Sequence, residues 1–214
     1  MSELFYRALR GFGAAVFRLA TTPKILHVER ARRAGAYLLA SNHVCAYDAP
    51  LLIVATPRVI HWLSVAKLFQ NPFARAFMEA FGVMPLERRK MNATTVRTVV
   101  RLLRAGNVVG MFPEGGMRRG EDSVMQSGKI DPGICKLAQM ARVPVLPCVV
   151  AGGEKLQRWT SWLPWIRARW IVAFGEPIFP HEKMDRDAAQ EIMAEEITHA
   201  LRALGAEVAG NLAS

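Results

Sequence analysis

The chain alternates short apolar runs with longer segments of mixed polarity, and this alternation restricts the folds that it can adopt. Strands that alternate with helices along a sequence are typical of α/β domains, in which helices cover a central sheet. A length of 214 residues suits one such domain and is enough for a substantial core. The strand-like runs are 36–41, 58–64, 82–86, 107–112, 144–150 and 169–174.

The segments between these runs carry helix signals. The clearest start is at Asp131 and Pro132, because aspartate is a good N-cap and proline at the first helical position loses no hydrogen bond. The last segment combines apolar and charged residues at amphipathic spacing. Helices are therefore expected at 48–55, 71–80, 92–105, 132–141 and 185–204.

Residues 1–24 form an apolar segment interrupted by arginines. The uncharged window between Arg10 and Arg18 has seven residues, whereas crossing a bilayer takes about 20. The apolar positions follow helical spacing, which suits an amphipathic helix in a membrane interface, while packing on the protein's own core is the alternative. The expected organisation is a membrane-associating helix over 1–24 and a single domain over 25–214. The apolar positions are Leu4, Phe5, Leu9, Phe12, Val16 and Leu19.

The net charge indicates an anionic partner. Twenty-eight Lys and Arg residues against 18 Asp and Glu residues give a formal charge of +10, which suits a phospholipid surface, a phosphorylated small molecule or nucleic acid. The basic residues are spread along the chain and match no nucleic-acid-binding motif, so nucleic acid is not an expected partner. The three cysteines lack metal-ligand spacing, which predicts no metal site and favours a reducing, cytoplasmic setting.

Tryptophans and basic residues gather in the segment 152–168. Three of the five tryptophans lie there, together with Lys155, Arg158 and Arg167. Indole rings with basic neighbours suit a membrane interface, where a ring spans polar and apolar layers. This segment is therefore interpreted as a membrane contact, with a core loop or a dimer contact as the alternative.

A histidine and an aspartate follow the first strand-like run. Asn42 and His43 end the run over 36–41, and Asp48 comes five residues after the histidine. On a continuous helix that separation is about 140° away from a common face, so the side chains meet only if a turn folds the carboxylate back onto the ring. A carboxylate on one ring nitrogen leaves the other free to accept a proton, as a general base does. A structural histidine that caps a turn is the alternative.

Glycines and arginines follow two further runs. The segment 111–120, MFPEGGMRRG, breaks at a proline and continues with an acidic residue, two glycines and two arginines, and the segment 81–90, FGVMPLERRK, ends in paired arginines. Glycine permits close backbone approach to an anion and arginine binds phosphate, while a glycine turn and a solvated basic patch are the alternatives. If the strands are parallel, these ends converge with His43 on one rim. Such a rim suits a phosphate-bearing substrate with a hydroxyl or amine to deprotonate.

Four motifs in this order resemble those of the glycerolipid acyltransferase family, typified by 1-acyl-glycerol-3-phosphate acyltransferase. Asn42, His43 and Asp48 match its N-H-x-x-x-x-D motif, and the resemblance spans about 36–150. It implies a single α/β domain with a central, mostly parallel mixed sheet flanked by helices, and an N-terminal amphipathic helix. The other matching segments are 82–88, 112–115 (F-P-E-G) and 143–147 (V-P-x-x-P).

The third motif departs from the family pattern. Where the family has threonine and then arginine, this chain has Gly116 and Met117, and arginine appears one place later, at Arg118. A shifted loop that uses Arg118 for the phosphate fits this departure. A different head group, such as that of an aminoacyl lysolipid, fits it equally.

The resemblance implies transfer of a fatty acyl group from acyl-CoA or acyl-acyl carrier protein to the free hydroxyl of a lysophospholipid. The first candidate acceptor is 1-acyl-glycerol-3-phosphate, which would give phosphatidic acid. His43 would deprotonate the hydroxyl and Asp48 would orient His43, with no acyl-enzyme, metal or cofactor. The implied acceptor-binding residues are Asn42, Arg88, Glu114, Gly115, Gly116 and Arg118.

The implied setting is the cytoplasmic face of a membrane, where a peripheral enzyme of phospholipid biosynthesis meets anionic lipid. A thioester or ester hydrolase is the alternative that Ser41 and Cys45 raise, because each stands two residues from His43 in the sequence. It is less favoured, because neighbours in sequence rarely form a nucleophile–base pair and no G-x-S-x-G elbow is present. The intact pair of His43 and Asp48 disfavours a non-catalytic lipid-binding relative.

Overall fold

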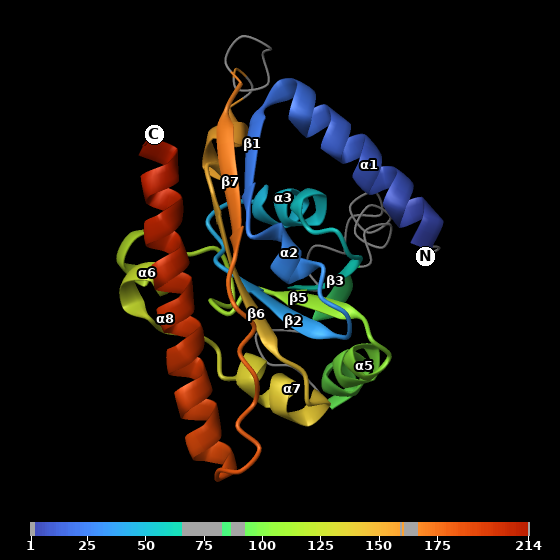
Figure 1. Cartoon of the computed structure of the whole chain (residues 1–214), viewed down its shortest axis with the longest axis vertical. Coiled ribbons are helices and arrows are strands. Elements are labelled where there is room, and N and C mark those ends of the chain that lie inside the picture. The colour runs from blue at the N-terminus through green and yellow to red at the C-terminus, as the bar shows by residue number, and fades with distance from the viewer. Residues whose placement is uncertain (1–2, 66–82, 87–92, 159, 161–166, 214) are drawn as a thin grey trace.

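The computed structural model describes residues 3–65, 83–86, 93–158, 160 and 167–213. Within these residues the chain forms a seven-stranded sheet with helices on both faces (Figure 1). The strands lie in the order β1-β7-β6-β2-β5-β3-β4. Their bounds are Thr22–Leu26 (β1), Tyr37–Ser41 (β2), Ile60–Val65 (β3), Met84–Leu86 (β4), Val108–Met111 (β5), Val145–Ala151 (β6) and Arg169–Phe174 (β7).

Strand direction changes once across the sheet. β6 and β7 pair antiparallel, with Cys148 opposite Phe174, whereas the other neighbouring strands pair parallel. β1 therefore runs with β7, and both run against the other five strands. The expected single α/β domain with a mostly parallel mixed sheet is confirmed.

The helices lie close to their predicted positions, with one clear difference at the carboxyl end. The predicted end at residue 204 is wrong, because α8 continues through Gly205 to Ala213. A Cβ at Gly205 would lie 3.0 Å from the sulfur of Met125, so this glycine gives room for packing instead of ending the helix. The predicted helix over 71–80 lies outside the described residues. The helix bounds are Glu3–Ala20 (α1), Val28–Ala31 (α2), Asp48–Ala55 (α3), Ala93–Arg104 (α5), Val124–Ser127 (α6), Gly133–Ala141 (α7) and Arg186–Ala213 (α8), with 3₁₀ turns at Gly120–Asp122 (η2) and Gly153–Gln157 (η3).

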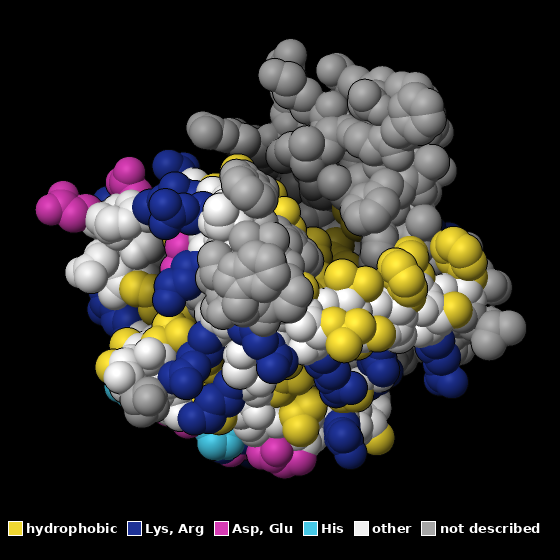
Figure 2. Space-filling model, turned by 90° about the horizontal axis from the view of Figure 1, so that it is seen from above, with side chains coloured by type: hydrophobic (Ala, Val, Ile, Leu, Met, Phe, Trp, Pro, Cys, Tyr) yellow, Lys and Arg dark blue, Asp and Glu magenta, His cyan; other side chains and the backbone are white. Residues whose placement is uncertain are grey.

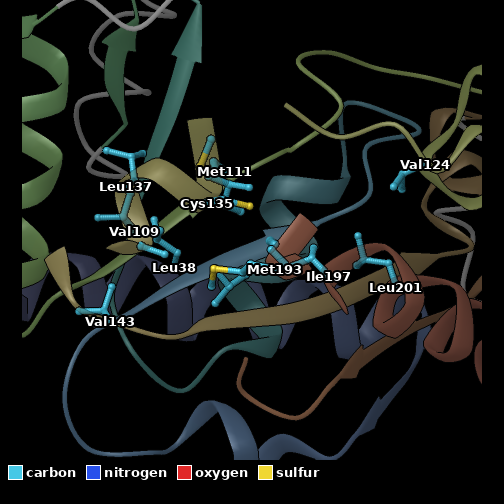
Figure 3. Close-up of a cluster of buried hydrophobic side chains, with 14 of the residues drawn as sticks. Leu38, Val109, Met111, Val124, Cys135, Leu137, Val143, Met193, Ile197 and Leu201 are labelled. Atoms are coloured by element: carbon cyan, nitrogen blue, oxygen red, sulfur yellow. The ribbon is translucent and has the colours of Figure 1, made fainter. Parts of the chain in front are cut away.

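The sheet separates two apolar layers. In β2, Leu38 and Ala40 face one layer, whereas Tyr37 and Leu39 face the other, as the alternation of side chains along a strand requires. Residues of α5, α7 and α8 complete the first layer, part of which Figure 3 shows. Residues of α1 and α3 complete the second layer. Because β2 is buried on both faces, its sequence reads as a continuous apolar run.

α1 packs one face on the second layer. Tyr6 and Phe17 are buried there, the backbone N–H of Ile60 donates to the Tyr6 hydroxyl at 3.3 Å, and Phe17 meets Trp170 edge-on with centroids 6.1 Å apart. Burial raises the pKa of Tyr6 above its usual range. One side of α1 therefore packs on the protein's own core, as the alternative interpretation of this segment expects.

The other side of α1 is exposed and apolar. Figure 2 shows hydrophobic side chains gathered along this helix, with Lys and Arg side chains beside them. Among the residues that the structure describes, no helix is both long and apolar enough to cross a membrane. Membrane association of the segment 1–24 stays a prediction. The exposed apolar side chains are Phe5, Phe12, Val16 and Leu19.

β1 is absent from the sequence-based assignment. It contains Pro23 and Lys24 and shows no clean apolar alternation. Its place at the sheet edge, where it pairs only with β7 among the described strands, tolerates a proline that a central strand would exclude. Of the tryptophan-rich segment, residues 153–157 form η3, while Trp159 and residues 161–166 lie outside the described residues.

Candidate active site

Two neighbouring parallel strands end side by side and carry the first and third motifs. Ala40 of β2 is opposite Met111 of β5, so the loops after both strands leave the same edge of the sheet. β6 continues at that edge beside β2, with Ser41 opposite Cys148. The expected convergence of these strand ends is therefore present, at the edge where open α/β sheets bind their ligands.

The side chain of Asn42 is engaged within the protein. Its amide nitrogen donates to the carbonyl of Val150 at 2.9 Å, and the backbone N–H of Val150 donates to its amide oxygen at 2.8 Å. This double contact holds the end of β2 against β6 and thereby fixes the position of the backbone that leads into His43. A contact between Asn42 and substrate stays a prediction.

Asp48 folds back onto His43, as the sequence requires for the pair to act together. It is the first residue of α3, its side chain is 1% exposed, and Oδ2 lies 3.0 Å from Nδ1 of His43. The same oxygen accepts the backbone N–H groups of Val44 at 2.6 Å and Cys45 at 2.8 Å. These bonds hold the turn between the two side chains in place.

This arrangement determines which imidazole nitrogen is available for chemistry. A carboxylate accepts a hydrogen bond from Nδ1–H, so the lone pair of the neutral ring of His43 lies on Nε2. Nε2 makes no hydrogen bond within the part of the chain that the structure describes. The geometry can therefore take up a proton at Nε2 while Asp48 stabilises the imidazolium that results.

Cys45 is a supporting residue beside the pair. Its thiol donates to Oδ1 of Asp48 at 3.1 Å, and burial, followed by this hydrogen bond, raises the pKa of the thiol to about 12. A thiol with such a pKa stays protonated at neutral pH and is a poor nucleophile. A Cβ on Gly153 would lie 3.1 Å from the Cys45 sulfur and 3.2 Å from Asp48 Oδ1, so the first residue of η3 must be small.

Glu114 connects the histidine loop with the third motif. Its carboxylate accepts the backbone N–H of His43 at 3.3 Å and that of Val124 at 3.0 Å. Burial raises the pKa of Glu114 above its usual value, although these two bonds work in the opposite direction. Gly115, next to it, has φ 67°, a left-handed conformation that favours glycine, and its N–H donates to the carbonyl of Phe112 at 3.1 Å. The structure thus shows Glu114 supporting the loops, and its contact with an acceptor stays a prediction.

The two arginines after Met117 have different environments. The backbone N–H of Arg118 donates to the carbonyl of His43 at 2.8 Å, and its guanidinium makes no hydrogen bond to a described residue. Arg119 instead uses its guanidinium to donate to the carbonyl of Val44 at 2.9 Å. Sequence reasoning did not identify this second contact. A Cβ at Gly116 would meet no atom within 4 Å, so the loop is open there. Arg88 lies outside the described residues.

An aromatic stack also supports His43, and the residues next to His43 in the sequence do not predict it. The rings of His43 and Phe112 are stacked with centroids 4.0 Å apart and an interplanar angle of 11°. Phe112 stacks in turn on Trp62 of β3, at 4.9 Å and 19°. Phe112 stands in the third motif, directly before the proline, and this is the only sequence signal that points to it. In the described residues, no group of three or more His, Cys, Asp or Glu side chains could hold a metal ion.

Comparisons with known proteins show what this chain is similar to. The Acyltransferase family matches residues 24–151, a range that includes His43, Asp48 and Glu114. The chain is 28% identical over 159 residues to the 1-acyl-sn-glycerol-3-phosphate acyltransferase of Bacillus subtilis (strain 168), covering 72% of this chain and 73% of that relative. It is 31% identical over 116 residues to the enzyme of the same name from Borreliella burgdorferi, covering 51% of this chain and 43% of that relative.

A solved structure shares the fold. The crystal structure of the 1-acyl-sn-glycerophosphate (LPA) acyltransferase from Thermotoga maritima superposes with a TM-score of 0.62 at 18% identity. The match covers 91% of this chain and 78% of that one, so it includes almost all of the architecture described above.

Proposed function

The chain belongs to the glycerolipid acyltransferase family and is an acyltransferase, and from this premise we propose that it acylates the free hydroxyl of a lysophospholipid. We propose 1-acyl-glycerol-3-phosphate as the acceptor and phosphatidic acid as the product, which would place the enzyme in phospholipid biosynthesis. The observation that supports this most is the buried contact between Asp48 and Nδ1 of His43 at the carboxyl edge of the sheet.

The proposed reaction is a direct transfer. Nε2 of His43 takes the proton of the acceptor hydroxyl as its oxygen attacks the carbonyl carbon of an acyl thioester. The tetrahedral intermediate then expels the thiolate, which takes the proton from the imidazolium and leaves as a thiol, while the new ester remains on the acceptor. A positioned base of this kind contributes about 10²–10⁴-fold to the rate. Because the Cys45 thiol stays protonated, no acyl-enzyme is included.

Arg118 is the proposed replacement for the arginine of the family's third motif. Its backbone bond to the His43 carbonyl keeps it next to the catalytic loop, and its guanidinium is not engaged by another described residue. Arginine binds phosphate through two parallel hydrogen bonds, so Arg118 suits the phosphate of the acceptor. Arg119 is less suited to that role, because its guanidinium already contacts Val44. Further proposed contacts to the acceptor come from Asn42, Arg88, Glu114, Gly115 and Gly116.

Acyl-CoA or acyl-acyl carrier protein is the proposed donor, and no metal ion or other cofactor takes part in the proposed steps. The formal charge of +10 supports partners that carry phosphates, including CoA and anionic lipid. Nucleic acid is not among the proposed partners.

The exposed face of α1 supports a peripheral attachment to a membrane. Its four exposed apolar side chains lie on a different side of the helix from the buried Tyr6 and Phe17, and Lys and Arg side chains lie beside them (Figure 2). Such a helix can lie in the interface with its apolar side toward the acyl chains and with basic groups near anionic head groups. We propose attachment to the cytoplasmic face, because the lipid acceptor would lie in the membrane there.

Thioester consumption by the purified protein tests the function. Oleoyl-CoA and an oleoyl-acyl carrier protein serve as donors, with lysophosphatidate, other lysophospholipids and an aminoacyl lysolipid as acceptors. Acceptor-dependent turnover is expected to disappear in His43→Ala and to persist in His199→Ala, a matched change on the exposed side of α8. The best acceptor identifies the head group.

Two results would contradict the proposal. Turnover that survives His43→Ala would exclude the proposed base. Rapid thioester cleavage without any acceptor, abolished by Cys45→Ala, would instead support a hydrolase.

A further inference from the structure

We propose that Phe112 and Trp62 are positioning residues that hold the imidazole plane of His43 for proton transfer. This inference rests on the proposed function, because it assumes that His43 acts as the base. It assigns a role to two aromatic side chains that need not touch substrate. The proposal is carried by three observations: the stack on His43, the burial of Trp62, and the glycine across from Trp62 on β5.

One hydrogen bond does not fix an imidazole ring. The contact from Asp48 Oδ2 to Nδ1 places one edge of the His43 ring, but the ring can still tilt about that contact. The torsion that turns an imidazole is broad in the absence of other contacts. Phe112 removes this freedom, because its ring lies nearly parallel to the imidazole at a centroid distance of 4.0 Å. Together the carboxylate and the ring determine the direction in which Nε2 points.

Phe112 is itself held by Trp62. The two rings are stacked at 4.9 Å and 19°, and Trp62 is only 2% exposed, so its indole is fixed by the core. Phe112 lies just beyond the end of β5 and is partly buried against the layer that contains Trp62. A rigid ring behind Phe112 prevents it from turning away from His43.

A glycine makes room for the indole. Gly110 of β5 is opposite Trp62 of β3, and a Cβ built on Gly110 would lie 2.8 Å from both Trp62 Cε3 and Ile60 Cγ2. The indole therefore occupies the space that a side chain at 110 would need. Because Gly110 and Phe112 are two residues apart, they share one face of the strand, and an indole over Gly110 reaches Phe112. The three positions form one support that ends at the catalytic ring.

The expected effect is on turnover rather than on acceptor binding. Misplacing a catalytic group by about 1 Å can lower a rate by about 10²-fold. Phe112→Leu keeps an apolar side chain but loses the flat ring, so kcat is expected to fall roughly tenfold or more while the KM for the acceptor changes less than about twofold. Phe112→Tyr keeps the ring and is expected to restore kcat to within about threefold of wild type.

The second position supplies an independent pair of variants. Nε1 of Trp62 is buried and has no hydrogen-bond partner among the described residues, so Trp62→Phe loses no bond that the structure shows. It keeps a flat ring behind Phe112 and is expected to retain most of kcat. Trp62→Leu removes the flat ring and is expected to lower kcat in the same manner as Phe112→Leu.

A spectroscopic measurement follows the stack without depending on activity. A ring stacked on the imidazole shifts the Cε1–H proton of His43 upfield through its ring current, and this resonance can be assigned in ¹³C-histidine-labelled protein by its loss in His43→Ala. Phe112→Leu is expected to move the resonance downfield, whereas Phe112→Tyr is expected to keep it. Phe174→Leu is the matched control, because Phe174 is buried in the same apolar layer but lies on β7, without a ring contact to His43. It is expected to leave both the resonance and kcat unchanged.

The outcomes separate this inference from the proposed function. Loss of turnover in His43→Ala tests the proposed function. If His43→Ala is inactive but Phe112→Leu keeps the wild-type kcat, the positioning role alone is overturned. An unchanged His43 resonance in Phe112→Leu would overturn it as well. Equal losses in Phe112→Leu and Phe174→Leu would show that the effect is general destabilisation of the core, which also contradicts the proposal.

Discussion

At the residue scale, Asp48 is the most highly connected group of the site. Both of its carboxylate oxygens accept hydrogen bonds, from the His43 ring, from two backbone N–H groups and from the Cys45 thiol. With the side chain 1% exposed, water cannot replace these donors. Asp48 therefore sets the tautomer of His43 and the shape of the turn at the same time.

Asp48→Asn separates the charge of this group from the shape that it gives the turn. An amide oxygen in the place of Oδ2 can still accept the backbone N–H groups of Val44 and Cys45 and the Nδ1–H of His43. It carries no negative charge, so the imidazolium that forms during the proposed proton transfer loses its stabilisation. We expect kcat to fall by about 10²–10⁴-fold, with the unfolding temperature close to that of wild type. Asp122→Asn, at an exposed site, is the control for loss of a charge.

The Cys45 thiol predicts a dependence of stability on alkaline pH. Its folded pKa of about 12 lies above the ordinary thiol value, so the folded state favours the protonated form. The corresponding stability is complete below about pH 8.5 and decreases as the pH rises toward 12. We expect the urea midpoint of wild type to fall between pH 8 and pH 10.5, and to fall less in Cys45→Ala. An equal fall in both proteins would show that other groups, such as the buried hydroxyl of Tyr6, dominate this range.

The residue roles could be predicted where they depend on neighbours in sequence. His43 and Asp48 stand within one turn, so their spacing and the strand before them already indicate the contact. The stack of Trp62 on Phe112 joins a residue of β3 to one that follows β5, and no local sequence pattern predicts it. The same holds for Arg119, whose partner Val44 is 75 positions away in the chain.

At the scale of elements, η3 must lie close to the start of α3. Gly152 has φ 85°, and a Cβ there would lie 2.4 Å from the carbonyl oxygen of Arg169. Gly153 lies against Cys45 and Asp48, as described above. The pair of glycines thus lets the chain leaving β6 lie between β7 and the turn that joins His43 to Asp48.

Gly152→Ala is predicted to destabilise the fold. The left-handed backbone costs a non-glycine residue of the order of 1–3 kcal/mol, and the contact with Arg169 is with backbone, which cannot swing aside. We expect a loss of about 2 kcal/mol or more in the free energy of unfolding, measured in urea. Gly210→Ala, where a Cβ meets nothing within 4 Å inside α8, is expected to be neutral or slightly stabilising.

α1 yields a prediction for membrane binding. Phe12 and Leu19 are exposed, so changing both to serine removes apolar surface without opening a cavity in the core. We expect the double variant to sediment with anionic vesicles at least about tenfold less than wild type, with an unchanged unfolding temperature. Phe179→Ser, an exposed aromatic outside this helix, should sediment like wild type. Equal binding by the double variant would show that α1 is not the membrane contact.

The accuracy with which elements could be predicted follows their burial. Strands buried on both faces, such as β2 and β6, are mostly apolar and stand out in the sequence. β1 lies at an edge, holds Pro23, and differs little from a loop in composition. α8 extends past Gly205 because Met125 packs there, and a residue on another helix leaves no mark in the local sequence.

At the scale of the whole molecule, the positive charge and the exposed apolar surface both contribute to the proposed membrane attachment. The formal charge of +10 predicts that binding to anionic vesicles weakens as salt screens it, over a Debye length of about 10 Å at 0.1 M. We expect sedimentation with vesicles that contain phosphatidylglycerol to decrease as NaCl is raised from about 50 to about 500 mM. Binding to neutral phosphatidylcholine vesicles should be weaker and change little. Salt-insensitive binding to both would assign the attachment to apolar contacts alone.

The reversed pair of strands determines at which edge of the sheet α1 ends relative to His43. β2 ends at the edge that carries His43, and β1 and β7, running the opposite way, begin at that same edge. α1 leads directly into β1 (Figure 1), so its carboxyl end meets the sheet at the edge that carries His43, three strands away from β2. Had β1 kept the common direction, the helix would meet the sheet at the opposite end. An interfacial α1 would then dock the enzyme with its reaction centre pointing away from the bilayer. Under the proposed attachment through α1, the reversal of two strands therefore sets both where the enzyme attaches and which edge of its sheet is turned toward the bilayer.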